Sequence, residues 1–144
     1  MTDEHERFQQ SRISLRTLYQ DPVSESWSEP YRSSRRMEIY GSLKLPPIQQ
    51  GGLYQAGCFV ASLDGMITLG DSSDGSQVAK RNRADPQGAD SDFWMLTMLE
   101  SAMDCVVAAT ETLCSAPGYR PGWADPQLCA DREAEKGAPL PLLV

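Results

Sequence analysis

The sequence has 144 residues, enough for one domain with a buried core, and its hydrophobic (40%) and charged (23%) fractions are ordinary for a globular protein. Its formal net charge is −7, and the imbalance lies after residue 50, where thirteen acidic residues face six basic ones. This charge argues against nucleic-acid binding, because phosphates require a basic face. No apolar run is long enough to span a bilayer, and the acidic N-terminus has no apolar signal core, so we expect a cytoplasmic protein without membrane contact.

The cysteines and the histidine argue against a metal site and against histidine-based catalysis. None of the four cysteines (Cys58, Cys105, Cys114 and Cys129) forms a C-x-x-C pair, and His5 is the single histidine. We therefore expect no metal site, and the residues themselves nominate no catalytic group. Cys58 and Cys105 lie in apolar runs, where a free thiol behaves as a small hydrophobe.

The first 36 residues are interpreted as a partly disordered N-terminal extension. A short helix is predicted from Ser14, with apolar side chains spaced at one helical face, and it ends at Asp21-Pro22. Residues 22–36 are rich in Ser, Glu, Pro and Arg and are predicted to be loop. This loop includes a basic cluster that is interpreted as solvated, formed by Arg32, Arg35 and Arg36.

Strands are predicted in the middle of the chain. Met37–Leu45 alternates loosely and is predicted as an edge strand, whereas Cys58–Ser62 is predicted as a buried strand. A second strand, Met66–Leu69, follows the Asp64-Gly65 turn at once. Residues 70–88 are polar and rich in Gly, Asp and Ser, which predicts a long loop.

The C-terminal third indicates a βαβ unit. An amphipathic helix is predicted over 91–103, capped by Asp90 or Ser91, with apolar side chains at Phe93, Met95, Leu96, Met98, Leu99, Ala102 and Met103. A buried parallel strand is predicted over 105–109, beside the Cys58–Ser62 strand. Residues 115–138 are predicted to be irregular. Another strand begins at Leu142, so we expect the chain to be the first part of a longer domain whose sheet is incomplete at the C-terminus.

Five segments together resemble the reductase domain of the bacterial riboflavin-pathway deaminase-reductases and the stand-alone pyrimidine reductases. The segments are IYGSLKLP (39–46), FVASLDGMITL (59–69), DGSQ (74–77), MLESAMDCVVAATETL (98–113) and EKGAPLPLLV (135–144). The resemblance implies a dihydrofolate-reductase-like α/β fold, a mixed sheet with βαβ units, over residues 37–144. It also implies NADPH as the cofactor and hydride transfer to a phosphoribosylamino-pyrimidine or a related small molecule.

The same resemblance implies the site residues. Ala61, Val78 and Thr112 match positions near NADPH, and Ser76 matches a position that reaches the substrate. Asp64 is interpreted as structural, because an aspartate in such a turn bonds to nearby backbone N–H groups.

The sequence departs from the family pattern at three positions. Glu100 stands where the family has an arginine that approaches the substrate phosphate, and Ala109 and Glu111 stand where many members have two glycines. Because carboxylates repel phosphates, we expect weak or no NADPH binding. The alternative is a truncated or degenerate non-catalytic relative that acts at most as an interaction module. We expect the isolated chain to be poorly soluble, molten or dimeric, so a homodimer is among the expected partners.

Overall fold

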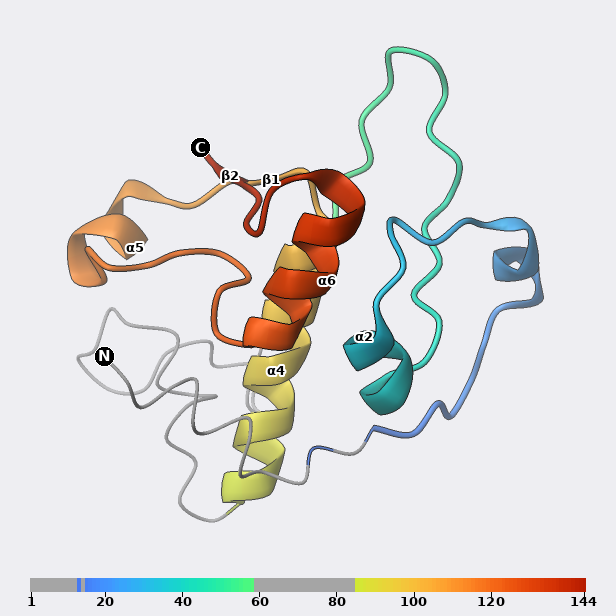
Figure 1. The fold of residues 1–144 in the computed structure, drawn as a ribbon, viewed down its shortest axis with the longest axis horizontal. Helices are drawn as coiled ribbons and strands as arrows, with labels where there is room; N and C mark the ends of the chain where they lie inside the picture. Colours follow the sequence, from blue (N-terminus) through green and yellow to red (C-terminus); the bar gives the residue numbers. More distant parts are fainter. Residues whose placement is uncertain (1–12, 14, 59–84) are drawn as a thin grey trace, which may run out of the picture.

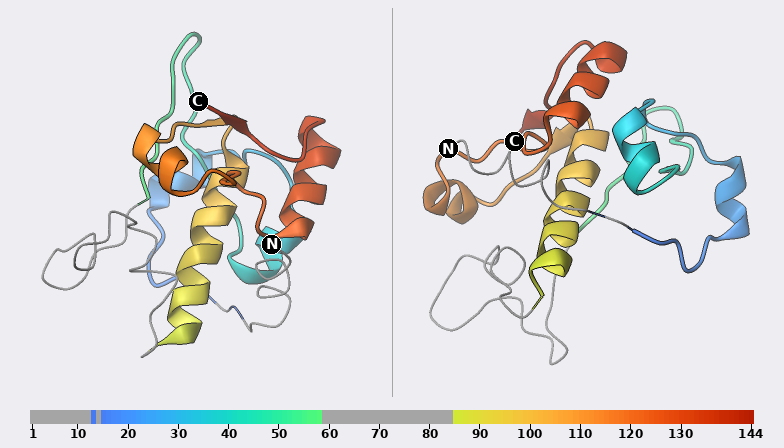
Figure 2. Two further views of the ribbon diagram at one scale, coloured as in Figure 1. Left: turned by 90° about the vertical axis from the view of Figure 1, so that its left-hand side faces the viewer. Right: turned by 60° about the horizontal axis from the view of Figure 1, so that its bottom comes forward.

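The computed structural model describes residues 13, 15–58 and 85–144, and these form a mixed α/β arrangement. In chain order, the elements are η1 (Pro22–Ser26), α2 (Ser34–Ile39), α4 (Pro86–Ala102), β1 (Cys105–Val106), α5 (Thr110–Ser115), α6 (Pro126–Lys136) and β2 (Leu142–Leu143). Helix α4 runs through the middle of the described residues and packs against α6 (Figure 1). Helices α2 and α5 lie on opposite sides of α4 (Figure 2).

Helix α4 carries the centre of the core. Trp94 and Met98 are completely buried on it, and Leu128 of α6 is completely buried opposite them. The predicted apolar stripe is confirmed in part: Phe93 and Ala102 are buried, whereas Met95, Leu99 and Met103 only line the core. The buried face also includes two hydroxyl side chains, which bond to carbonyl groups of their own helix. Thr97 Oγ1 donates to Phe93 C=O at 3.0 Å and Ser101 Oγ to Met98 C=O at 2.8 Å.

The helix begins five residues earlier than the sequence predicts. Asp85, rather than Asp90 or Ser91, is the N-cap, and its Oδ1 accepts from Gly88 N–H at 2.9 Å. Pro86 occupies the first helical position, where its missing N–H costs nothing.

Two further predictions for the first half of the chain are wrong. No helix forms among residues 15–20. Leu18 and Tyr19 are 85% and 78% exposed, so too few side chains of this segment pack against the core to offset the nucleation cost of a short helix. The Met37–Leu45 edge strand is also absent. Ser33 caps α2 instead, accepting from Arg36 N–H at 3.0 Å, and only Leu45 makes an isolated antiparallel bridge, to Ser28.

The loop predicted for residues 22–36 contains η1 and the start of α2. The interpretation of its arginines as solvated is wrong for two of the three: Arg36 is completely buried and Arg35 is paired with Asp125, whereas Arg32 is exposed. Helix α2 crosses residue 36, where the sequence analysis places the end of the N-terminal extension.

The segment predicted to be irregular, residues 115–138, contains helix α6. Asp125 is its N-cap, accepting from Gln127 N–H at 2.9 Å and from Leu128 N–H at 3.3 Å. The helix ends at Lys136, and Gly137 is its C-cap, where a φ of 74° suits a residue without a side chain.

The strand predicted at Leu142 is confirmed. It pairs in parallel with β1, with Cys105 opposite Leu142 and Val106 opposite Leu143. The β1 strand is parallel to β2, and it is shorter than the predicted strand 105–109 and not buried: Cys105 is exposed and Val107 is 79% exposed. Its predicted pairing with Cys58–Ser62 stays a prediction. The exposed Cys105 and Cys58 therefore do not serve as the core hydrophobes that the sequence predicts. Two other predicted strands are not tested. Cys58–Ser62 lies outside the described residues except for Cys58, and Met66–Leu69 lies wholly outside them.

Candidate functional site

The candidate cofactor residue Thr112 lies just beyond the carboxyl end of β1. The β1–β2 ladder ends with Val144 N–H donating to Val106 C=O at 2.9 Å and Ala108 N–H donating to Val144 C=O at 3.0 Å. Helix α5 begins two residues after Ala108, and Thr112 is in its first turn, with an exposed side chain. Ligands of open parallel sheets collect at this end of the strands, so the position of Thr112 suits a ligand contact.

The other predicted site residues lie outside the described residues. These are Ala61 and Val78, predicted to contact the cofactor, and Ser76, predicted to contact the substrate. The structure therefore places one of the four predicted residues, Thr112, and leaves their grouping a prediction.

Glu111 precedes Thr112 and is exposed in the same turn of α5. Residue Ala109, the N-cap, makes no side-chain hydrogen bond to the helix. A carboxylate at this place stabilises the start of the helix but repels an anionic ligand. The described end of β1 thus offers a hydroxyl group and a negative charge.

Glu100, the second departure from the family pattern, is engaged in a structural contact. Its carboxylate accepts hydrogen bonds from the Tyr119 hydroxyl and from Gly122 N–H, the latter at 2.8 Å. Burial, together with the hydrogen bond to Glu100 and its charge, raises the pKa of Tyr119, so the phenol stays a donor. Glu100 therefore fastens the segment after α5 to helix α4.

Gly122 allows this segment to approach α4 closely. Its φ is +72°, and a Cβ atom there would lie 3.1 Å from the backbone N and Cα of Ser101. Any other residue would combine backbone strain with a collision against the helix backbone.

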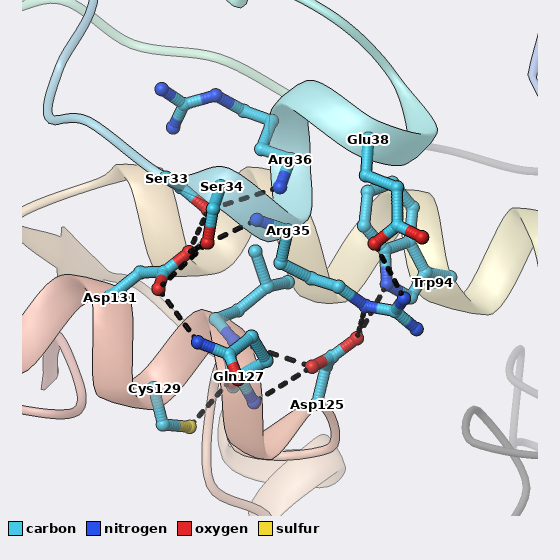
Figure 3. Close-up of polar contacts among 12 residues, drawn as sticks. Ser33, Ser34, Arg35, Arg36, Glu38, Trp94, Asp125, Gln127, Cys129 and Asp131 are labelled. Carbon is cyan, nitrogen blue, oxygen red and sulfur yellow. Dashed lines mark hydrogen bonds and ion pairs between the residues drawn. The ribbon is translucent and has the colours of Figure 1, made fainter.

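A cluster of polar contacts joins α2 to α6 and to α4 (Figure 3). Asp125 is 2% exposed, and its Oδ2 accepts from Trp94 Nε1 at 2.8 Å and from Arg35 Nε at 3.0 Å. Asp131, one turn and a half further along α6, accepts from Ser33 Oγ at 2.7 Å and from Arg35 N–H at 3.1 Å. Gln127 Nε2 adds a third bond to Asp131 at 2.9 Å.

The electrostatics of this cluster indicate a structural role. Burial raises the pKa of Asp131, but the hydrogen bonds from Ser33, Gln127, the Arg35 backbone and Ser34 outweigh burial and lower its pKa overall. The carboxylate oxygens of Asp125 and Asp131 all accept hydrogen bonds from neighbouring donors. Neither carboxylate is therefore available as a general base. No sequence pattern predicted this cluster, and the one local signal for it is Asp125-Pro126, which is typical of a helix start.

Within residues 13, 15–58 and 85–144, no three His, Cys, Asp or Glu side chains gather into a group that could hold a metal ion. The same residues contain no helix that is both long and apolar enough to cross a membrane. Comparison of the chain with protein-family models, curated proteins and solved structures found no match. Its function must therefore be inferred from its residues and their geometry.

Proposed function

We propose that this chain is an NADPH-dependent reductase of the pyrimidine reductase type, with a dihydrofolate-reductase-like fold. One observation carries the proposal: Thr112 lies in the first turn of the helix that follows β1, beyond the carboxyl end of a parallel strand pair. An exposed hydroxyl at that place can donate to or accept from a dinucleotide.

In this proposal, Ala61, Val78 and Thr112 hold the cofactor, and Ser76 orients a phosphoribosylamino-pyrimidine or a related small molecule. NADPH, when bound, supplies the hydride, and the chain supplies position and electrostatics. The fit of the described residues to the cofactor is mixed, because Thr112 suits it and Glu111 opposes its phosphates. Weak binding by the unmodified chain is the expected result.

The second candidate function is a non-catalytic relative that serves as an interaction module. The observation that favours it is the engagement of Glu100, whose carboxylate bonds to Tyr119 and Gly122. A residue committed in this way contributes nothing to anion recognition. Together with Glu111, it leaves two acidic side chains at the positions where the resemblance implies phosphate contacts.

Calorimetric titration with NADPH separates the two functions. We compare the unmodified chain with Glu111→Gly and Glu111→Gln, which remove the charge, and with Glu135→Gln, which removes an exposed charge from α6. Binding that appears or strengthens in both Glu111 variants, and not in Glu135→Gln, supports the reductase. Adding Thr112→Val should then weaken binding by about 1 kcal/mol, or about fivefold, the usual value of one hydrogen bond.

Micromolar binding by the unmodified chain would also support the reductase and would show that Glu111 does not face the phosphates. Absence of binding in every variant, with circular dichroism showing that all are folded, would favour the non-catalytic alternative.

A further inference from the structure

The parallel pair β1–β2 is too short to align itself. Each strand has two residues, and the pair has no third strand among the described residues. An isolated two-stranded pair is at best marginally stable in water, even when it is longer than this one. The alignment of Cys105 with Leu142 must therefore be supported by the segments that lead into the two strands.

Arg132 of α6 contacts both of these segments. Its side chain is buried, and its Nε donates to Ser101 C=O at 3.1 Å while Nη2 donates to Met103 C=O at 3.3 Å. These two carbonyl groups lie at the end of α4, just before β1. On the other side, Nη1 donates to Ala138 C=O at 2.5 Å, in the segment that leads from α6 into β2.

The guanidinium group is suited to this task because it is planar and carries five N–H donors in a fixed geometry. It fixes Met103, two residues before Cys105, relative to Ala138, four residues before Leu142. An ion pair between Lys136 Nζ and Asp104 Oδ1, at 2.6 Å, joins the same two segments. Because the Asp104 side chain is 89% exposed, water screens this pair and it contributes less than Arg132.

We infer that Arg132 is the positioning residue of this sheet: it fixes the register of β1 against β2, and with it the place of α5 and Thr112. The effect on the sheet stands on the contacts alone. The effect on ligand binding rests on the proposed function, because it assumes that Thr112 contacts NADPH.

Amide hydrogen exchange of the full chain tests the effect on the sheet. Leu142 N–H donates to Asp104 C=O and Val144 N–H to Val106 C=O, so both amides report directly on the pairing. In Arg132→Met, we expect these two amides to exchange at least tenfold faster, while amides in the middle of α4, such as Met98, change less than threefold. Arg132→Lys should lie between, because an ammonium group can reach one segment but not hold both.

The control is Lys136→Met, which should change the Leu142 and Val144 amides less than Arg132→Lys does. Equal acceleration at Met98 and at the two sheet amides would mean that Arg132 stabilises the whole fold without positioning the sheet, and would overturn the inference. Unchanged exchange at Leu142 and Val144 would overturn it as well. If Arg132→Met does not fold, Arg132→Lys decides by the same criteria.

The effect on binding is measured by NADPH titration in the Glu111→Gln background, where we expect Arg132→Lys to raise the Kd about tenfold. A Kd unchanged by Arg132→Lys would overturn the inferred effect of Arg132 on NADPH binding. If no variant binds NADPH, Glu111→Gln and Glu111→Gly included, the proposed function fails, and the exchange measurement still decides the role of Arg132 in the sheet.

Discussion

At the scale of single residues, two buried arginines differ in how many of their donors are satisfied. Arg36 is completely buried, and its Cζ atom lies 4.9 Å from the centroid of the Tyr31 ring. Its Nη2 donates hydrogen bonds to Tyr31 C=O and to the Glu29 carboxylate. In the described part of the chain, its Nε and Nη1 are buried without a hydrogen-bond partner. The three nitrogens of Arg132, by contrast, each reach a carbonyl group.

This difference predicts unequal effects of the same substitution on the free energy of unfolding. Arg132→Met leaves three carbonyl groups unpaired and should cost about 3 kcal/mol. Arg36→Met leaves one carbonyl group unpaired, that of Tyr31, while it removes two unsatisfied buried donors, and Glu29 keeps its bond to Ser42. This substitution should therefore cost about 1 kcal/mol. Urea denaturation measures both. A cost for Arg36→Met that equals the cost for Arg132→Met would contradict the prediction.

Asp131 predicts a pH dependence of stability. Because its pKa is lower in the folded chain than in the unfolded chain, its charged form stabilises the fold, fully so above the unfolded pKa of about 4. The stabilisation is lost as the pH falls through the folded pKa. Asp131→Asn should therefore cost about 1 to 2 kcal/mol at pH 7, and progressively less below about pH 4. Thermal unfolding across this range checks the result, and a cost that is the same at pH 7 and pH 3 would argue against it.

At the scale of elements, the N-cap of α4 separates the observed helix start from the predicted one. Asp85 makes the capping bond to Gly88, whereas Ser91, inside the helix, donates to Gln87 C=O at 2.9 Å. Asp85→Ala should therefore destabilise the fold by about 1 kcal/mol, and Ser91→Ala should have a smaller effect. Equal costs in chemical denaturation would contradict the role of Asp85 as the N-cap.

Elements with a strong apolar pattern or flanking apolar residues were predictable from the sequence. The body of α4 and the strand at Leu142 were predicted, because their own side chains indicate the structure. Helix α6 was missed although Asp125-Pro126 and Lys136-Gly137 are good start and stop signals, because its single completely buried apolar side chain, Leu128, makes no periodic pattern.

Helix α2 could not be predicted from local sequence, because its support is distant. Ser33 and Arg35 bond to Asp131, which lies about a hundred residues away in the sequence. In the candidate site, Thr112 is the one residue that the sequence predicts and that lies in the described part of the chain. Its place after a parallel strand agrees with the prediction. The roles of Glu100 and Arg132 depend on contacts with the segments after α5 and α6, which no local pattern encodes.

At the scale of the whole molecule, α6 packs against both α4 and α2, while α5 and the β1–β2 pair lie at the margin of the described residues (Figure 1). The core is therefore made mainly by helix packing, and the sheet contributes little to it. This division explains how the polar cluster between α2 and α6 can support the fold while the carboxyl end of β1 stays exposed for other contacts.

The exposed sheet predicts self-association of the isolated chain. Val107, Leu142 and Val144 are 79%, 72% and 68% exposed, so apolar side chains in and next to the strand pair face water together. The net charge of −7 opposes association, and salt screens this repulsion. We therefore expect dimers or larger species that increase with protein concentration and with salt, measured by size-exclusion chromatography with light scattering and accompanied by binding of a hydrophobic dye.

Val107→Lys should shift the chain towards the monomer, whereas Val23→Lys, at an exposed apolar position of η1 away from the sheet, should not. A monomer with a sharp thermal transition at all concentrations, or association abolished by Val23→Lys alone, would show that the sheet is not the associating surface.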